Sequence, residues 1–144
     1  RPGDICRRGL FAAIHRLAAS VGRSLDDFII QFPVFTASGN NEDELEVAKR
    51  AIKYRIGFYG STPAYKSVLD THGWGDLQPL LNRMTKEGHW EKLPDQINDE
   101  ILETFAAVGE PLQVAETLRD RFGGYIDRTV LEAKHPPELL EEQM

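Results

Sequence analysis

Two short apolar segments, separated by about ninety residues of mostly helical pattern, restrict the fold of this chain most. Residues 28–36 are dense in aromatic and β-branched side chains and too short for a helix, which predicts a strand. Pro33 cannot donate to a ladder, so it marks a bulge, a strand end or an unpaired flank. Residues 125–131 predict a second strand. Strand–helix alternation implies a parallel sheet covered by helices, but two strands close neither a barrel nor a doubly wound sheet. The sequence therefore predicts an α/β chain that lacks most of its sheet.

Helical periodicity fills the remaining sequence. Apolar residues at three- and four-residue spacings predict an amphipathic helix over residues 4–21, closed by Gly22. A longer helix begins at Asn41, which suits a capping box with Glu44, and ends at Gly60. Further helical stretches are expected from Ser61, from Leu77 to Gly88, over about 90–105 and from Pro111 to Phe122.

Charge and composition exclude several classes of protein. The net charge is −6, and no basic stripe is present, which argues against a nucleic-acid partner. No apolar run approaches the roughly 20 residues that span a bilayer, and no segment has the order of a signal peptide. Cys6 is the one cysteine, which fits a reducing, cytoplasmic compartment. The four histidines are far apart in sequence, so no metal site is expected.

Three separated motifs carry a family resemblance. They are Ile-Gly-Phe-Tyr-Gly-Ser-Thr-Pro-Ala-Tyr at 56–65, His-Gly-Trp-Gly-Asp at 72–76 and Phe-Ala-Ala-Val-Gly-Glu-Pro at 105–111. In order and spacing the chain resembles the luciferase-like monooxygenase superfamily, and most closely its branch of deazaflavin-dependent oxidoreductases. One departure is Glu110, where the family more often has a Thr or Ser cap before the proline.

The resemblance implies a (β/α)8 TIM barrel, of which this chain holds the C-terminal part with about two strands. Residues 28–36 and 125–131 would be the seventh and eighth strands, with a long helical excursion between them. Residues 1–135 would form this barrel segment and residues 136–144 a polar tail. The chain begins with Arg1 rather than Met, which suggests that it was trimmed, cleaved or cut from a longer reading frame.

Candidate site residues follow from the rule that the chemistry of such barrels lies at the carboxyl ends of the strands. The helical excursion is also expected to reach over the barrel mouth. The residues selected in this way are Thr36, Ser38, Tyr59, Ser61, Tyr65, Glu132 and Lys134.

Each of these residues also has a purely structural alternative. Thr36 and Ser38 can be turn residues that bond their own backbone, and Tyr59 and Tyr65 can be packing aromatics. Ser61 has the spacing of a helix cap, and Glu132 and Lys134 can be solvated residues of a polar tail. The catalytic residues themselves are expected in parts of the barrel outside this chain.

The resemblance implies an oxidoreductase whose parent protein transfers hydride or activates oxygen on a small organic substrate. The cofactor would be the deazaflavin coenzyme F420 or, alternatively, FMN, bound mostly by absent parts of the parent. The resemblance leaves room for a homodimeric parent, and the fragment alone is expected to be inactive. The rival interpretation is a non-catalytic helical interaction module derived from a barrel remnant.

Overall fold

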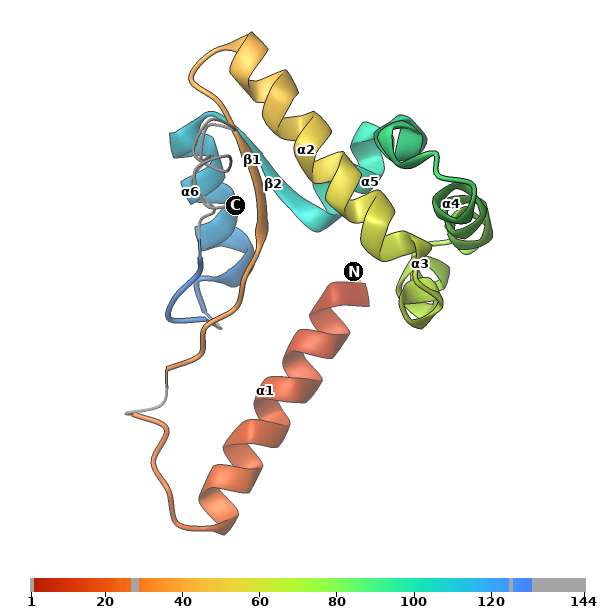
Figure 1. Cartoon of the computed structure of the whole chain (residues 1–144). Helices are drawn as coiled ribbons and strands as arrows, with labels where there is room; N and C mark the ends of the chain where they lie inside the picture. Colours follow the sequence, from red (N-terminus) through yellow and green to blue (C-terminus); the bar gives the residue numbers. More distant parts are fainter. Residues whose placement is uncertain (1, 27–28, 125, 131–144) are drawn as a thin grey trace, which may run out of the picture.

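The computed structural model describes residues 2–26, 29–124 and 126–130. Its elements, in chain order, are α1 (Pro2–Ser20), β1 (Phe35–Ser38), α2 (Glu42–Ser61), the 3-10 helix η1 (Pro63–Tyr65), α3 (Lys66–Thr71), α4 (Leu77–Lys86), the 3-10 helix η2 (Trp90–Gln96), α5 (Asp99–Phe105), β2 (Ala106–Gly109) and α6 (Pro111–Phe122). The predicted succession of helices is confirmed (Figure 1). No helix in the described part of the chain is long and apolar enough to cross a lipid bilayer.

The sheet consists of β1 and β2, which pair in parallel with Phe35 opposite Ala106 and Ser38 opposite Gly109. Paired residues of a parallel ladder point to the same face, so the register defines two faces. Ala37 and Ala106 belong to the core that α2, α4, η2 and α5 complete. Ala107 packs on the opposite face against α6, so the strands lie between α2 and α6 (Figure 1). The sheet is thus open at its edges and covered on both faces.

The two predicted strands are only partly correct. β1 begins at Phe35, and residues 29–34 contribute one isolated bridge, Gln31 with Arg128. Pro33 explains the interruption, because it has no N–H for a ladder. The predicted strand at 125–131 is wrong for its described residues, 126–130, which form that bridge and no strand.

The second strand lies instead at β2, where the sequence reads Ala-Ala-Val-Gly. This segment follows α5 without a loop and lacks the run of β-branched and aromatic residues that signals a strand. Tertiary packing determines its conformation: Ala106 and Ala107 are fully buried between the two helical layers. Small side chains allow both layers to approach the backbone closely.

The long helix α2 organises the larger core. One half of the predicted capping box is present, since Glu44 N–H donates to Asn41 Oδ1 at 2.9 Å, whereas the Glu44 carboxylate accepts from the Asn40 N–H at 2.9 Å. Ala48, Ile52 and Ile56 face the core, where Leu81, Leu93, Ile97 and Leu102 are the largest fully buried side chains. A Cβ on Gly57 would stand 3.0 Å from the Leu93 Cβ, so glycine permits η2 to lie directly against α2.

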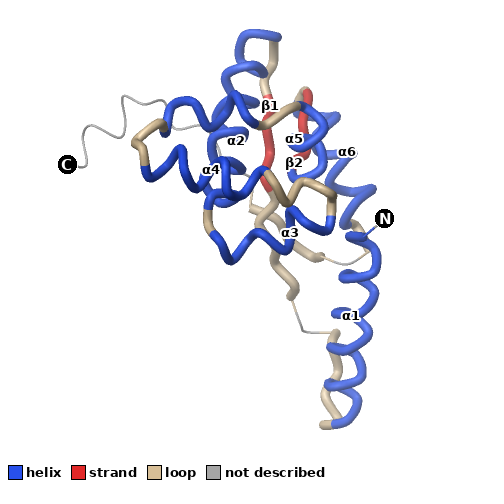
Figure 2. The backbone as a smooth tube through the Cα atoms, turned by 90° about the vertical axis from the view of Figure 1, so that its right-hand side faces the viewer, coloured by secondary structure: helices blue, strands red, loops and turns tan. Residues whose placement is uncertain are grey.

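The first helix stands apart from these layers. Figure 1 and Figure 2 both show α1 projecting away from the sheet and its covering helices. The helix ends as predicted, with Gly22 at a φ of 66°. Leu17, on the apolar face of α1, is 67% exposed, so this face does not pack into the core at that residue.

Two side-chain amides of α4 hold the C-terminus of α2. Gln78 Nε2 and Asn82 Nδ2 each donate to the carbonyl of Ser61 at 3.0 Å. The last carbonyls of a helix have no partner within it, so these donors satisfy a group that would otherwise be buried unpaired.

We expect Gln78→Met to lower the free energy of unfolding by about 1 kcal/mol, because it removes one buried hydrogen bond while keeping the side-chain length. Urea unfolding measures this difference. Gln96→Met is the matched control, since Gln96 is half-buried and its side-chain amide makes no hydrogen bond among the described residues. Equal losses in the two variants would contradict a specific role for the Gln78 amide.

An ion-pair network joins α2 to the start of α5. Asp99 accepts from Lys53 at 2.6 Å and lies 3.6 Å from Lys49, which also pairs with Glu46 at 2.7 Å. The hydrogen bond from Lys53 holds the pKa of Asp99 below its ordinary value of 3.8. The hydrogen bond to Glu46 raises the pKa of Lys49.

The pKa of Asp99 predicts how the network depends on pH. A depressed carboxyl pKa adds stability that is present above the unfolded value and disappears as pH falls through the folded value. Asp99→Asn should therefore lower the free energy of unfolding at neutral pH, by less than about 1 kcal/mol because the carboxylate is exposed. Urea unfolding of both proteins should show the difference shrinking as pH falls below the ordinary pKa of Asp99; an undiminished difference in acid would contradict the electrostatic origin.

Candidate functional site

The predicted site residues are divided between the two ends of the parallel sheet. The carboxyl ends of β1 and β2 meet where Ser38 pairs with Gly109. Helix α2 starts beyond this end and runs back along β1, so its last turns lie where the strands begin. The Tyr59 ring accordingly lies 6.0 Å from the ring of Phe35, the first residue of β1. The expectation that the helical excursion covers the carboxyl end is therefore wrong for α2, η1 and α3.

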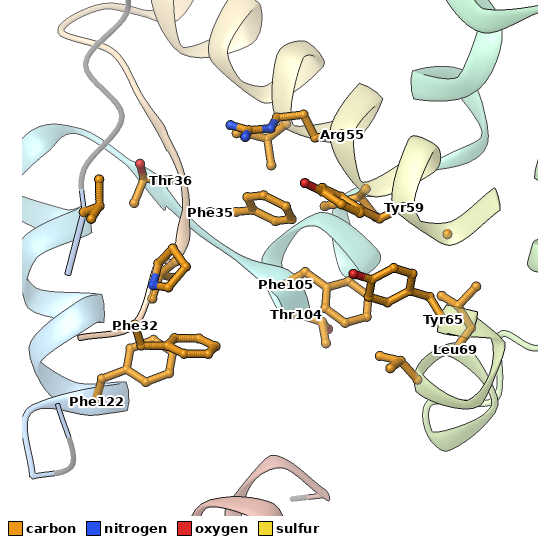
Figure 3. A pocket seen from close by; sticks show the side chains of 17 residues that line it. Phe32, Phe35, Thr36, Arg55, Tyr59, Tyr65, Leu69, Thr104, Phe105 and Phe122 are labelled. Atoms are coloured by element: carbon orange, nitrogen blue, oxygen red, sulfur yellow. The ribbon is translucent and has the colours of Figure 1, made fainter. Parts of the chain in front are cut away.

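A cavity of about 530 Å³ opens at the amino end of the strands. Figure 3 shows aromatic side chains from β1, α2, η1, α5 and α6 around it. The lining residues are Phe32, Pro33, Val34, Phe35, Thr36, Ile52, Arg55, Ile56, Tyr59, Gly60, Tyr65, Val68, Leu69, Thr104, Phe105, Phe122 and Val130. Its size falls within the range of small-molecule sites in proteins.

Three predicted residues, Thr36, Tyr59 and Tyr65, come together in this cavity. The Tyr59 and Tyr65 rings meet edge to face with centroids 5.6 Å apart, a favourable aromatic geometry. Ser38 and Ser61 do not line it. Glu132 and Lys134 lie outside the described residues.

The two serines differ in their hydrogen bonding. Ser61 Oγ donates to the Phe58 carbonyl at 2.7 Å, within α2, so it does not cap the next helix; Thr62 occupies that position. Ser38 Oγ is buried and has no hydrogen-bond partner in the described structure, so it does not bond its own backbone as a turn residue would. Ser38 is therefore the one predicted residue whose polar atom stands unused at the carboxyl end.

The helix N-termini at the carboxyl end are satisfied by their own side chains. Glu44 Oε2 accepts from the Asn40 N–H at 2.9 Å, in addition to the bond between Glu44 and Asn41. At α6, Gln113 Oε1 accepts from the Glu110 N–H at 3.0 Å, which gives this helix a cap despite the unusual residue before Pro111. The Glu44 carboxylate repels an anion at α2, and the Gln113 amide oxygen occupies the cap of α6, so the described residues here do not form a phosphate site.

Residues that the sequence did not single out form much of the cavity. The Arg55 guanidinium lies 5.3 Å from the Phe35 ring centroid, a cation–π distance. Phe105 contacts His72 and Trp74 edge to face, with centroids 5.5 and 6.0 Å away. The aromatic residues within 28–36 could have signalled this cluster, but the sequence analysis interpreted them as evidence for a strand only. In the described residues no group of three or more His, Cys, Asp or Glu could hold a metal ion.

Comparison with known proteins decides the family. The profile of the luciferase-like monooxygenase family matches residues 7–128. The chain belongs to the luciferase-like monooxygenase family. It is 44% identical over 118 residues to the uncharacterized protein Rv1360 of Mycobacterium tuberculosis and to the uncharacterized protein Mb1395 of Mycobacterium bovis. The matched region is 82% of this chain but 35% of each relative, so this luciferase-like chain spans about a third of their length.

The contrast between the serines of this luciferase-like chain predicts opposite effects of mutation. Ser61→Ala should lower the free energy of unfolding by about 1 kcal/mol, because it removes a hydrogen bond. Ser38→Ala should leave it unchanged or raise it by up to about 1 kcal/mol, because it removes a buried hydroxyl without a partner. Thermal or urea unfolding of the two variants checks this. A larger loss for Ser38→Ala than for Ser61→Ala would refute the assignment.

Proposed function

We propose that this chain is the C-terminal part of an oxidoreductase that uses coenzyme F420 or FMN on a small organic substrate. Membership of the luciferase-like monooxygenase family over residues 7–128 is the observation that carries the proposal. The lengths of the relatives support the proposal that this chain is part of a longer protein, because about two thirds of each relative lies outside the matched region. The complete protein would be a (β/α)8 barrel with its chemistry at the carboxyl ends of the strands.

The described residues do not fit either cofactor by themselves. FMN and the deazaflavin cofactor both carry phosphate, which proteins hold with cations or free helix N-termini. At the carboxyl end of β1 and β2, the N-terminus of α2 is occupied by Asn41 and Glu44, and that of α6 by Gln113. We therefore assign the phosphate site to other parts of the parent, and derive no catalytic step from this chain.

The contribution of this chain would be one wall of the barrel. Bound cofactor supplies hydride transfer or oxygen activation, and the protein supplies shape, orientation and electrostatics. Ser38 is the residue of this segment best placed to meet the reaction site. Its hydroxyl lies at the carboxyl end of β1 and has no partner among the described residues.

A titration with both cofactors tests the proposal. The isolated 144-residue chain should show no saturable binding of FMN or coenzyme F420, and the complete reading frame that contains it should bind one of them. Cofactor fluorescence anisotropy measures both.

Two results would count against the proposal. Tight binding by the isolated chain would contradict its status as part of a larger site. A complete reading frame that binds neither cofactor would contradict the oxidoreductase assignment and favour a non-catalytic helical module.

A further inference from the structure

The last described residues of the chain end at the cavity on the amino side of the strands. Val130 lines this cavity, together with the residues that lead into β1. Val130 and Phe32 are 44% and 53% exposed there, although both are apolar. Proteins seldom leave a contiguous apolar surface uncovered, because its burial against other apolar groups is favourable. A further segment of the protein is therefore expected beside these two residues.

Backbone hydrogen bonds attach this end of the chain to the segment that precedes β1. The Arg128 N–H donates to the Ile30 carbonyl at 3.2 Å, and the Phe32 N–H donates to the Arg128 carbonyl at 3.1 Å. The Thr129 hydroxyl adds a third bond, to the Phe32 carbonyl at 3.0 Å. Val130 is thus held at the cavity wall by the residues immediately before it.

The direction of the chain at this point is fixed by its pairing. Gln31 and Arg128 form a parallel bridge, so the residues that follow each of them advance in the same direction. On the side of Gln31, the four residues 33–36 come next, and all four line the cavity (Figure 3). On the side of Arg128, residues 131–144 follow in the sequence, outside the described part of the chain. A continuation of the parallel course would therefore pass along the cavity lining.

We infer that residues 131–135 cover this cavity, so that its occupant is the chain itself. Continued in the same register, the chain would place Leu131 beside Val34 and Ala133 beside Thr36. Two prolines come next in the sequence, and they would end the pairing because they have no N–H to donate. The cavity would then admit small molecules only when this segment is displaced. The inference does not rest on the proposed oxidoreductase activity, because it concerns the opposite end of the strands.

A disulfide between the two segments tests the inference in a Cys6→Ser background, which has no other cysteine. Thr36→Cys with Ala133→Cys should form an intramolecular disulfide under mild oxidation, because paired strands lie about 4.8 Å apart and disulfides span such distances. Val47→Cys with Ala133→Cys is the matched control, since Val47 is 63% exposed on α2 and does not line the cavity. The Thr36 pair should link at least about tenfold faster, because docking raises the effective concentration of its partner. Mass spectrometry measures both rates, and equal rates would overturn the inference.

Removal of the segment provides a second measurement. In the same background, Thr36→Cys should react with a maleimide about tenfold faster in a chain that ends at Val130 than in the 144-residue chain. Ala48→Cys, at a core position of α2 that is 6% exposed, should react slowly in both and so verify that the core is intact. An unchanged rate at Thr36→Cys would overturn the inference. So would failure of the Thr36–Ala133 disulfide in the complete reading frame, because another part of the protein would then cover the cavity.

Discussion

The close approach of α2 to the β1–β2 pair determines the arrangement of nearly everything else in the described structure. A parallel pair requires a long connection, and α2 is the first and longest part of that connection. Ala37 and Ala106 on the sheet, and Gly57 toward η2, keep the backbones near one another. The core then follows, because Leu81, Leu93, Ile97 and Leu102 fill the space that α2 shares with α4, η2 and α5.

This packing also separates the two candidate sites. Because α2 runs back along β1, the aromatic end of the helix meets the start of the strand, while its acidic N-terminus stays at the carboxyl end. The amino end thereby gains a cavity that several aromatic rings and, among the described residues, the Arg55 side chain line. The buried Ser38 hydroxyl lies at the carboxyl end. The backbone N–H groups at the helix N-termini there donate to side chains of their own helices. Chemistry at the carboxyl end would require groups from elsewhere in the barrel.

The sheet of the described chain is covered on both faces but not paired at its edges. Parallel sheets are stable when helices cover both faces, and α2 and α6 meet that requirement here. The outer edges of β1 and β2 have no strand partner in the described residues. In a (β/α)8 barrel the remaining strands would pair at these edges and close the sheet on itself.

The sequence by itself determined the helices, the ends of several of them and the family. Asn41 with Glu44, Gly22 and Pro111 mark helix ends through local hydrogen bonding and backbone preference, which need no distant partner. Only the tertiary structure decided the strands and the grouping of the site residues. The segment Ala106–Gly109 has no intrinsic strand signal and adopts a strand because it is buried between two helical layers. By contrast, Pro33 interrupts residues 28–36, the segment with the strongest strand signal. Likewise Tyr59 and Tyr65 join Phe35 while Ser38 lies apart, because the direction of α2 relative to β1 is set by packing, which the linear pattern of residues does not encode.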